Sequence, residues 1–179
     1  MGGAVARNRL KLLRMLDCHT PLGKLFIEHQ YKTQKVLEAR GYTVINTPVD
    51  DHFSDVILAK MVNGRLTMCG VAEIKSRDTA GGQKLTRKYL NDNGGYLITE
   101  RKLRLGAMAA STYSVPFYVI VNLINEGVIL VWQITNNKGI FVEDHPTART
   151  ETRSTVNGGT ANRVNAFLQM DSKYLTVIE

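Results

Sequence analysis

Cysteine and long apolar runs are scarce in this 179-residue sequence. The two cysteines, Cys18 and Cys69, are too few for a disulfide framework or for a zinc site built from cysteine pairs. No apolar run is long enough to span a membrane, and charged residues interrupt the N-terminal region where a signal peptide would have its apolar core. None of the four histidines has a metal-ligand spacing to another histidine or to a cysteine. These absences indicate a cytoplasmic protein in a reducing setting, without a membrane partner.

Acidic residues are also in deficit. Lysine and arginine number 23 against 16 aspartates and glutamates, and the net charge of +7 favours a polyanionic partner, above all nucleic acid. The alternative is charge that serves only solubility. The sequence Gly81-Gly82-Gln83-Lys84 lacks the Gly-Lys-Ser/Thr ending of a phosphate-binding loop, so no nucleotide cofactor is expected.

The length fits one domain over residues 1–179, which begins with a basic N-terminal extension over residues 1–19. A helix is predicted to begin at Thr20-Pro21, an N-cap followed by proline, and to end at Arg40-Gly41. Three stretches rich in Val, Ile, Leu and Thr follow and are typical of strands: Tyr42 to Thr47, Asp55 to Val62, and Leu66 to Lys75.

Helix and strand patterns continue in the second half of the chain. The predicted elements are a short helix or ordered loop at Gln83 to Leu90, a helix at Glu100 to Tyr113, strands at Val115 to Ile124 and Val128 to Thr135, and an edge strand at Tyr174 to Ile178. Residues 143–163 lack apolar periodicity and are predicted to form a flexible loop. Together these elements predict an α/β domain with a mixed central β-sheet flanked by helices.

Two of the predicted strands have mostly the composition of buried strands, and Asp55, Glu73 and Lys75 are three of their four charged residues. Side chains alternate along a strand, so Glu73 and Lys75 project from one face while Ile74 points to the other. Asp55 begins the preceding strand, and its carboxylate can meet that of Glu73 if the two strands form a hairpin. Two converging carboxylates suit Mg²⁺ or Mn²⁺, because hard cations prefer oxygen ligands. Lys75 would then orient an attacking water or stabilise developing charge.

The turn between these two strands decides whether the carboxylates can meet. A two-residue turn at Asn63-Gly64 leaves Asp55 one residue out of register with Glu73, on the opposite face of the sheet. A three-residue loop, or a bulge near Gly70, pairs Asp55 with Glu73 instead. We therefore predict one of these two irregularities.

The order of a helix, Ser54-Asp55-Val56-Ile57 and Ala72-Glu73-Ile74-Lys75 resembles the PD-(D/E)XK nuclease superfamily, and within it the small phage and archaeal resolvase-like enzymes. The similarity covers Gly23 to Leu123 in layout. It implies a restriction-endonuclease-like core in which the aspartate and glutamate bind Mg²⁺ and the lysine assists catalysis; by resemblance, these are Asp55, Glu73 and Lys75.

The family often adds a catalytic, metal-binding glutamate from the first helix, and the resemblance assigns that role to Glu28, with Glu38 as the alternative. Two departures from the family pattern concern other positions. Ser54 stands where the family has proline, and Gln83 and Tyr89 are six residues apart where some members have a glutamine and a tyrosine four apart.

The resemblance implies a metal-dependent DNA nuclease of a bacterial, archaeal or phage-infected cell, most simply a resolvase-like or restriction-like endonuclease, among which homodimers are common. One alternative is a non-catalytic nucleic-acid-binding protein that retains the fold. Another is a structural or interaction protein in which Glu73 and Lys75 form an ordinary ion pair. Basic residues that follow the site are expected to contact the DNA backbone: Lys84, Arg87, Lys88, Arg101 and Lys102.

Overall fold

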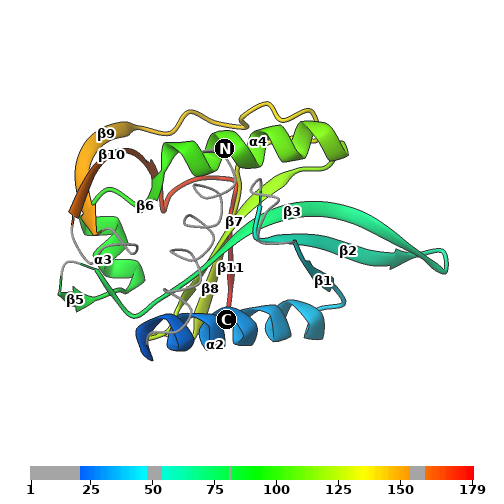
Figure 1. Cartoon of the computed structure of the whole chain (residues 1–179), viewed down its shortest axis with the longest axis horizontal. Helices are drawn as coiled ribbons and strands as arrows, with labels where there is room; N and C mark the ends of the chain where they lie inside the picture. The colour runs from blue at the N-terminus through cyan, green and yellow to red at the C-terminus, as the bar shows by residue number, and fades with distance from the viewer. Residues whose placement is uncertain (1–20, 48–53, 81, 154–159) are drawn as a thin grey trace, which may run out of the picture.

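The computed structural model describes residues 21–47, 54–80, 82–153 and 160–179 (Figure 1). The predicted basic extension over residues 1–19 lies outside these described residues. No helix in the described ranges is long and apolar enough to cross a membrane.

A mixed six-stranded sheet forms the centre of the molecule. Its strands follow the spatial order β1-β2-β3-β7-β8-β11, in which β3 and β7 run parallel and every other neighbouring pair runs antiparallel. The strands are β1 (Thr43–Asn46), β2 (Val56–Val62), β3 (Arg65–Arg77), β7 (Phe117–Leu123), β8 (Val128–Gln133) and β11 (Leu175–Ile178). The prediction of an α/β domain with a mixed central sheet is confirmed.

Helices cover both faces of this sheet (Figure 1). Helix α2 (Pro21–Ala39) lies along one face, where Leu37 packs with Ile74 and Ile120 in a small core. Helix α4 (Glu100–Tyr113) lies along the other face, and the short helix α3 (Arg87–Asp92) follows the small β4–β5 hairpin (Thr79–Ala80 and Gln83–Lys84). The two helix layers therefore make the two faces of β3 chemically distinct, because alternate β3 residues face α2 and α4.

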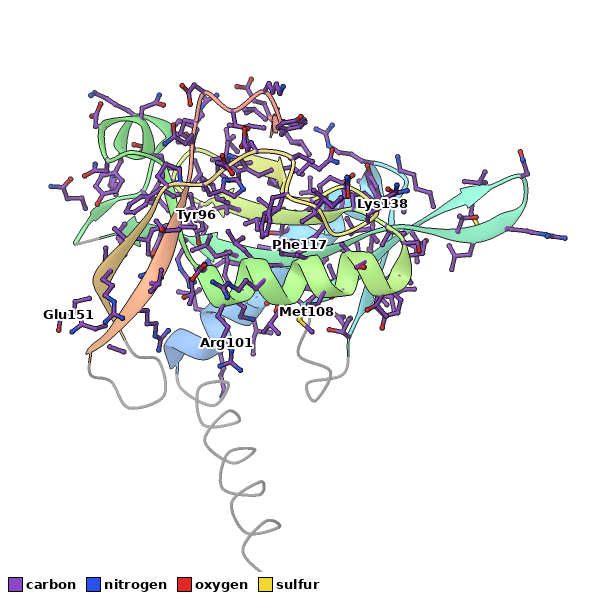
Figure 2. The ribbon with its side chains drawn as sticks, turned by 90° about the horizontal axis from the view of Figure 1, so that it is seen from above. Tyr96, Arg101, Met108, Phe117, Lys138 and Glu151 are labelled. Carbon is purple, nitrogen blue, oxygen red and sulfur yellow. The ribbon has the colours of Figure 1, made fainter. Side chains whose placement is uncertain are left out.

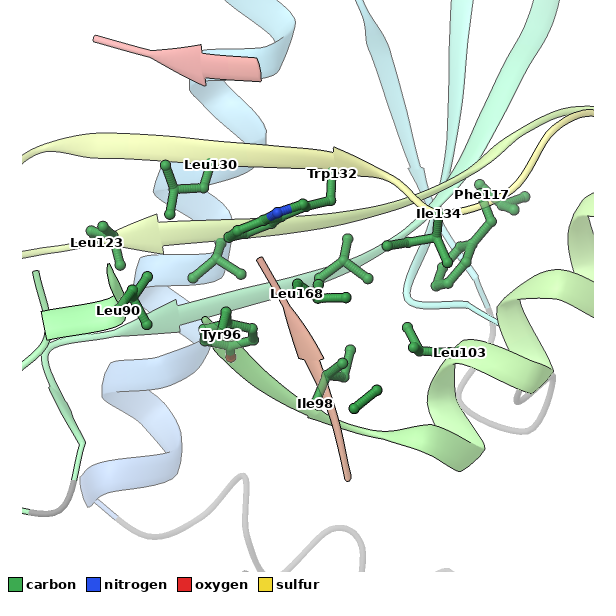
Figure 3. Close-up of a cluster of buried hydrophobic side chains, with 14 of the residues drawn as sticks. Leu90, Tyr96, Ile98, Leu103, Phe117, Leu123, Leu130, Trp132, Ile134 and Leu168 are labelled. Carbon is green, nitrogen blue, oxygen red and sulfur yellow. The ribbon is translucent and has the colours of Figure 1, made fainter. Parts of the chain in front are cut away.

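The larger core lies on the α4 side. Figure 3 shows Trp132, Phe117 and Leu103 among its buried side chains. Trp132 is fully buried, and its indole N–H donates to the carbonyl of Gln169 at 2.9 Å. Gly106 lies where α4 comes close to the sheet, since an added Cβ there would lie 2.2 Å from Cε1 of Phe117.

The described residues within 143–163 differ from the predicted flexible loop. Residues Thr147–Arg153 form β9 and Thr160–Leu168 form β10, which join β6 (Tyr96–Thr99) in a three-stranded antiparallel sheet of order β6-β10-β9. Ala166 and Leu168, which pair with β6, are buried in the larger core, whereas the described side chains of Thr147–Glu151 and Ala161–Val164 are exposed or only partly buried. Apolar alternation is therefore missing from this part of the β9–β10 hairpin, while threonines and backbone pairing still favour strands.

Candidate active site

The β2–β3 hairpin sets the position of Asp55. Its turn is the two-residue Asn63-Gly64 type with positive φ at both residues, and Val62 pairs with Arg65. The register then shifts by one residue between Leu58 and Ala59, which pair with Gly70 and Met68. Cys69 is the extra residue, so a bulge lies next to Gly70 and the predicted irregularity is confirmed.

The bulge brings the two carboxylates onto the same face. Val56 pairs with Ala72, and the backbone N–H of Asp55 donates to the carbonyl of Ala72 at 3.0 Å, so Asp55 lies opposite Glu73. Cys69 Sγ lies 3.4 Å from the carbonyl oxygen of Leu58 across the bulge. A regular ladder from the same turn would have put Asp55 on the α2 face instead.

Asp55 is fixed by two hydrogen bonds to one oxygen. Its Oδ2 accepts from the backbone N–H of Ile74 at 3.0 Å and from Nζ of Lys75 at 3.3 Å. Burial raises the pKa of Asp55 above its ordinary value, because desolvation and the nearby Glu73 charge outweigh the stabilising effect of the Lys75 ammonium.

Glu73 is the deepest charged group of the site, with a side chain only 1% exposed. Its Oε1 lies 2.6 Å from Nζ of Lys75 and 3.0 Å from Nζ of Lys102, and its Oε2 accepts from Lys102 at 3.1 Å. Burial raises the pKa of Glu73, but the two ammonium groups more than offset this effect and hold the pKa below its ordinary value. Glu73 is therefore ionised.

Lys75 lies between the two carboxylates. Burial lowers its pKa, but the charges of Glu73 and Asp55 dominate and raise the pKa above its ordinary value. Lys75 is therefore a permanent ammonium at neutral pH. It can donate hydrogen bonds and stabilise negative charge, but it does not serve as a general base.

The donor set fits a hard divalent cation. Oε1 of Glu73 is buried and accepts no hydrogen bond of ordinary geometry from any described residue, although two ammonium nitrogens lie within ion-pair distance. Among the described residues no group of three or more His, Cys, Asp or Glu side chains could hold a metal ion, so this part of the chain offers the two carboxylates of Asp55 and Glu73. Mg²⁺ commonly binds through one or two carboxylates and completes its shell with water and phosphate oxygens.

Glu28 does not join this site in the structure. Its side chain is 58% exposed and pairs with Lys32 at 2.7 Å on the surface of α2. Helix α2 packs on the opposite face of β3, where Thr33 Oγ1 lies 3.3 Å from Ser76 Oγ. Glu38 likewise pairs with a surface lysine of α2. The expectation that a glutamate of the first helix completes the site is therefore corrected: helical phase and the choice of sheet face place both glutamates elsewhere.

The basic residues expected on DNA are dispersed. Arg87 pairs with Glu126 and Glu179, and Lys88 pairs with Asp92 at 2.6 Å, so both have carboxylate partners away from the site. Lys84 on β5 and Arg101 on α4 are exposed (Figure 2). Only Lys102 reaches the carboxylates.

The contact between Lys102 and Glu73 was not predicted. The two residues are 29 positions apart, and their meeting depends on how α4 crosses the sheet. The sequence offered one signal: the helix that follows the Glu-x-Lys strand begins with basic residues. This signal indicated a charged surface and did not identify a partner for Lys102.

Comparisons with protein-family models, with curated proteins and with solved structures found no match for the chain.

Proposed function

We propose that the chain is a metal-dependent DNA nuclease with a restriction-endonuclease-like core of the PD-(D/E)XK type. The observation that supports this most strongly is the shared face of Asp55, Glu73 and Lys75. It exists because a bulge at Cys69 corrects the register that the Asn63-Gly64 turn would otherwise impose. A hairpin that served only packing would not need two carboxylates and an ammonium together on a largely buried face.

Asp55 and Glu73 would hold Mg²⁺ or Mn²⁺ through one carboxylate each. When bound, such an ion lowers the pKa of a water ligand and neutralises charge on a phosphodiester. Lys75 would donate a hydrogen bond to the attacking water or to a non-bridging phosphate oxygen, because it stays protonated and lies beside both carboxylates. The backbone N–H of Ile74 keeps Asp55 in place through this step.

The net charge of +7 supports a polyanionic substrate, and DNA is our choice because the site resembles DNA nucleases of this superfamily. An endonuclease is proposed first. A protein that binds DNA without cutting it is the alternative outcome of the experiment below.

The test is incubation of the protein with linear, closed circular and four-way-junction DNA, in Mg²⁺ and in EDTA. We expect cleavage in Mg²⁺ only, including cleavage of closed circles, and at least about a hundredfold loss of rate in Lys75→Met. Lys88→Met is the matched control, since it removes one ammonium from an exposed ion pair with Asp92 and should keep the rate. Cleavage that is equal in wild type and Lys75→Met would refute the proposal.

A further inference from the structure

Lys102 is the third residue of α4, a position where its charge is not favoured by the helix. Cations are stabilised at the C-terminal end of a helix and opposed by the dipole at the N-terminal end. Thr99, the residue before α4, makes no side-chain capping hydrogen bond, and Glu100 is the single acidic residue of the first turn. The stabilising partner of Lys102 is therefore Glu73, which its ammonium contacts through both oxygens at 3.0 and 3.1 Å.

The two lysines around Glu73 differ in how firmly they are held. Lys75 is bound between Glu73 and Asp55, and its side chain is 27% exposed. Lys102 forms ion pairs and hydrogen bonds with Glu73 alone within the described part of the chain, and its side chain is 43% exposed. Lys102 is therefore the more exposed of the two lysines and has one carboxylate partner where Lys75 has two, so fewer ion pairs oppose its departure.

The charges of the site also favour an exchange. Asp55 and Glu73 contribute −2 and Lys75 and Lys102 contribute +2, so the four groups together are neutral. A divalent cation added to this set would leave +2 in a largely buried volume. Departure of Lys102 from Glu73 lowers the excess in that volume to +1.

We propose that Lys102 is an exchangeable counter-ion of Glu73: it holds the carboxylate when no divalent cation is bound and moves to a substrate phosphate when one is. The inference rests on the proposed function, because it needs a cation at Asp55 and Glu73. It assigns Lys102 a role in metal affinity as well as in substrate binding.

The first test measures binding of Mn²⁺ alone by calorimetry, without DNA. Lys102→Met removes the competing charge, so we expect it to bind Mn²⁺ at least about tenfold more tightly than wild type. Lys102→Arg keeps the charge and should stay near wild type. Arg101→Met, an exposed neighbour on the same helix, is the matched control and should change affinity less than about twofold. Lys102→Gln serves as a second neutral variant if circular dichroism shows that Lys102→Met is not folded.

The second test measures affinity for a duplex DNA in Ca²⁺ and in EDTA, conditions chosen to allow binding without cleavage. If Lys102 is released to phosphate by the cation, the loss of affinity caused by Lys102→Met must be larger in Ca²⁺ than in EDTA. The loss caused by Arg101→Met must be the same in both. An equal loss for Lys102→Met in the two conditions overturns the transfer to phosphate.

Failure of this inference and failure of the proposed function give different results. If wild type binds Mn²⁺ and Asp55→Asn abolishes that binding, the metal site stands. Equal or weaker Mn²⁺ affinity in Lys102→Met then overturns only the role of Lys102. If wild type binds no Mn²⁺, the proposed function is lost and the inference with it.

Discussion

Replacement of Gly106 by alanine tests how α4 is held against the sheet. An added Cβ would lie 2.2 Å from Cε1 of Phe117, and this side chain is fully buried. Alanine is favoured over glycine by about 1 kcal/mol in a helix interior, whereas overpacking of a core costs about 1–3 kcal/mol or more. The contact is far inside ordinary carbon separations of about 3.5–4.0 Å, so we expect the clash to dominate. Gly106→Ala should lower the free energy of unfolding by about 2 kcal/mol.

Urea unfolding followed by circular dichroism measures this change. Met108 lies on the same helix and is 55% exposed, so Met108→Ala and Met108→Gly report the alanine–glycine difference without a clash, about 1 kcal/mol in favour of alanine. Phe117→Leu in the Gly106→Ala background should recover part of the loss. A Gly106→Ala protein as stable as wild type, or more stable, would refute this account of how α4, and with it Lys102, is positioned.

Two further predictions concern charged and titrating groups. Lys75→Met removes the ammonium between Glu73 and Asp55 and should lower the free energy of unfolding in EDTA by about 2–4 kcal/mol. Addition of Mg²⁺ should restore part of this lost stability. A loss no larger than that of Lys88→Met, about 0.5 kcal/mol or less, would contradict this. Burial lowers the pKa of His145, so the unfolded chain binds its proton first and stability falls as the pH drops below about 6.5. His145→Gln should therefore lose less free energy of unfolding than wild type between pH 7.5 and 5.5, as measured by urea titration. The same dependence of this free energy on pH in the two proteins would contradict the prediction.

The central part of the site follows from strand alternation alone. Glu73 and Lys75 are two positions apart in a strand, so their shared face was predictable. The length of the Asn63-Gly64 turn showed that the hairpin needed an extra residue to bring Asp55 onto this face. The sequence did not decide between a longer turn and a bulge. The structure has the bulge at Cys69, and the adjacent Gly70 lies against Tyr118 of the neighbouring strand, where an added Cβ would be 2.7 Å from the ring.

Other parts of the site depended on contacts that span the chain. Glu28 is a carboxylate, as the prediction required, but it lies on the other side of the sheet. Thr33 and Leu37 pack α2 against the face of β3 opposite to Glu73. Lys102 reaches Glu73 only because α4 crosses above β3. The part of the β9–β10 hairpin before Asn165 was missed because it precedes the buried residues Ala166 and Leu168, and exposed strands lose the period-two pattern that identifies a strand in a sequence.

Cleavage of closed circular DNA in Mg²⁺ by Asp55→Asn, compared with Asp92→Asn, tests the central claim most directly. Both variants remove one carboxylate charge that pairs with a lysine, but only Asp55 lies opposite Glu73. We predict that Asp55→Asn loses at least about a hundredfold in rate while Asp92→Asn cuts like wild type. Equal cleavage by the two variants, both folded by circular dichroism, would contradict the assignment of Asp55, Glu73 and Lys75 as the cutting site.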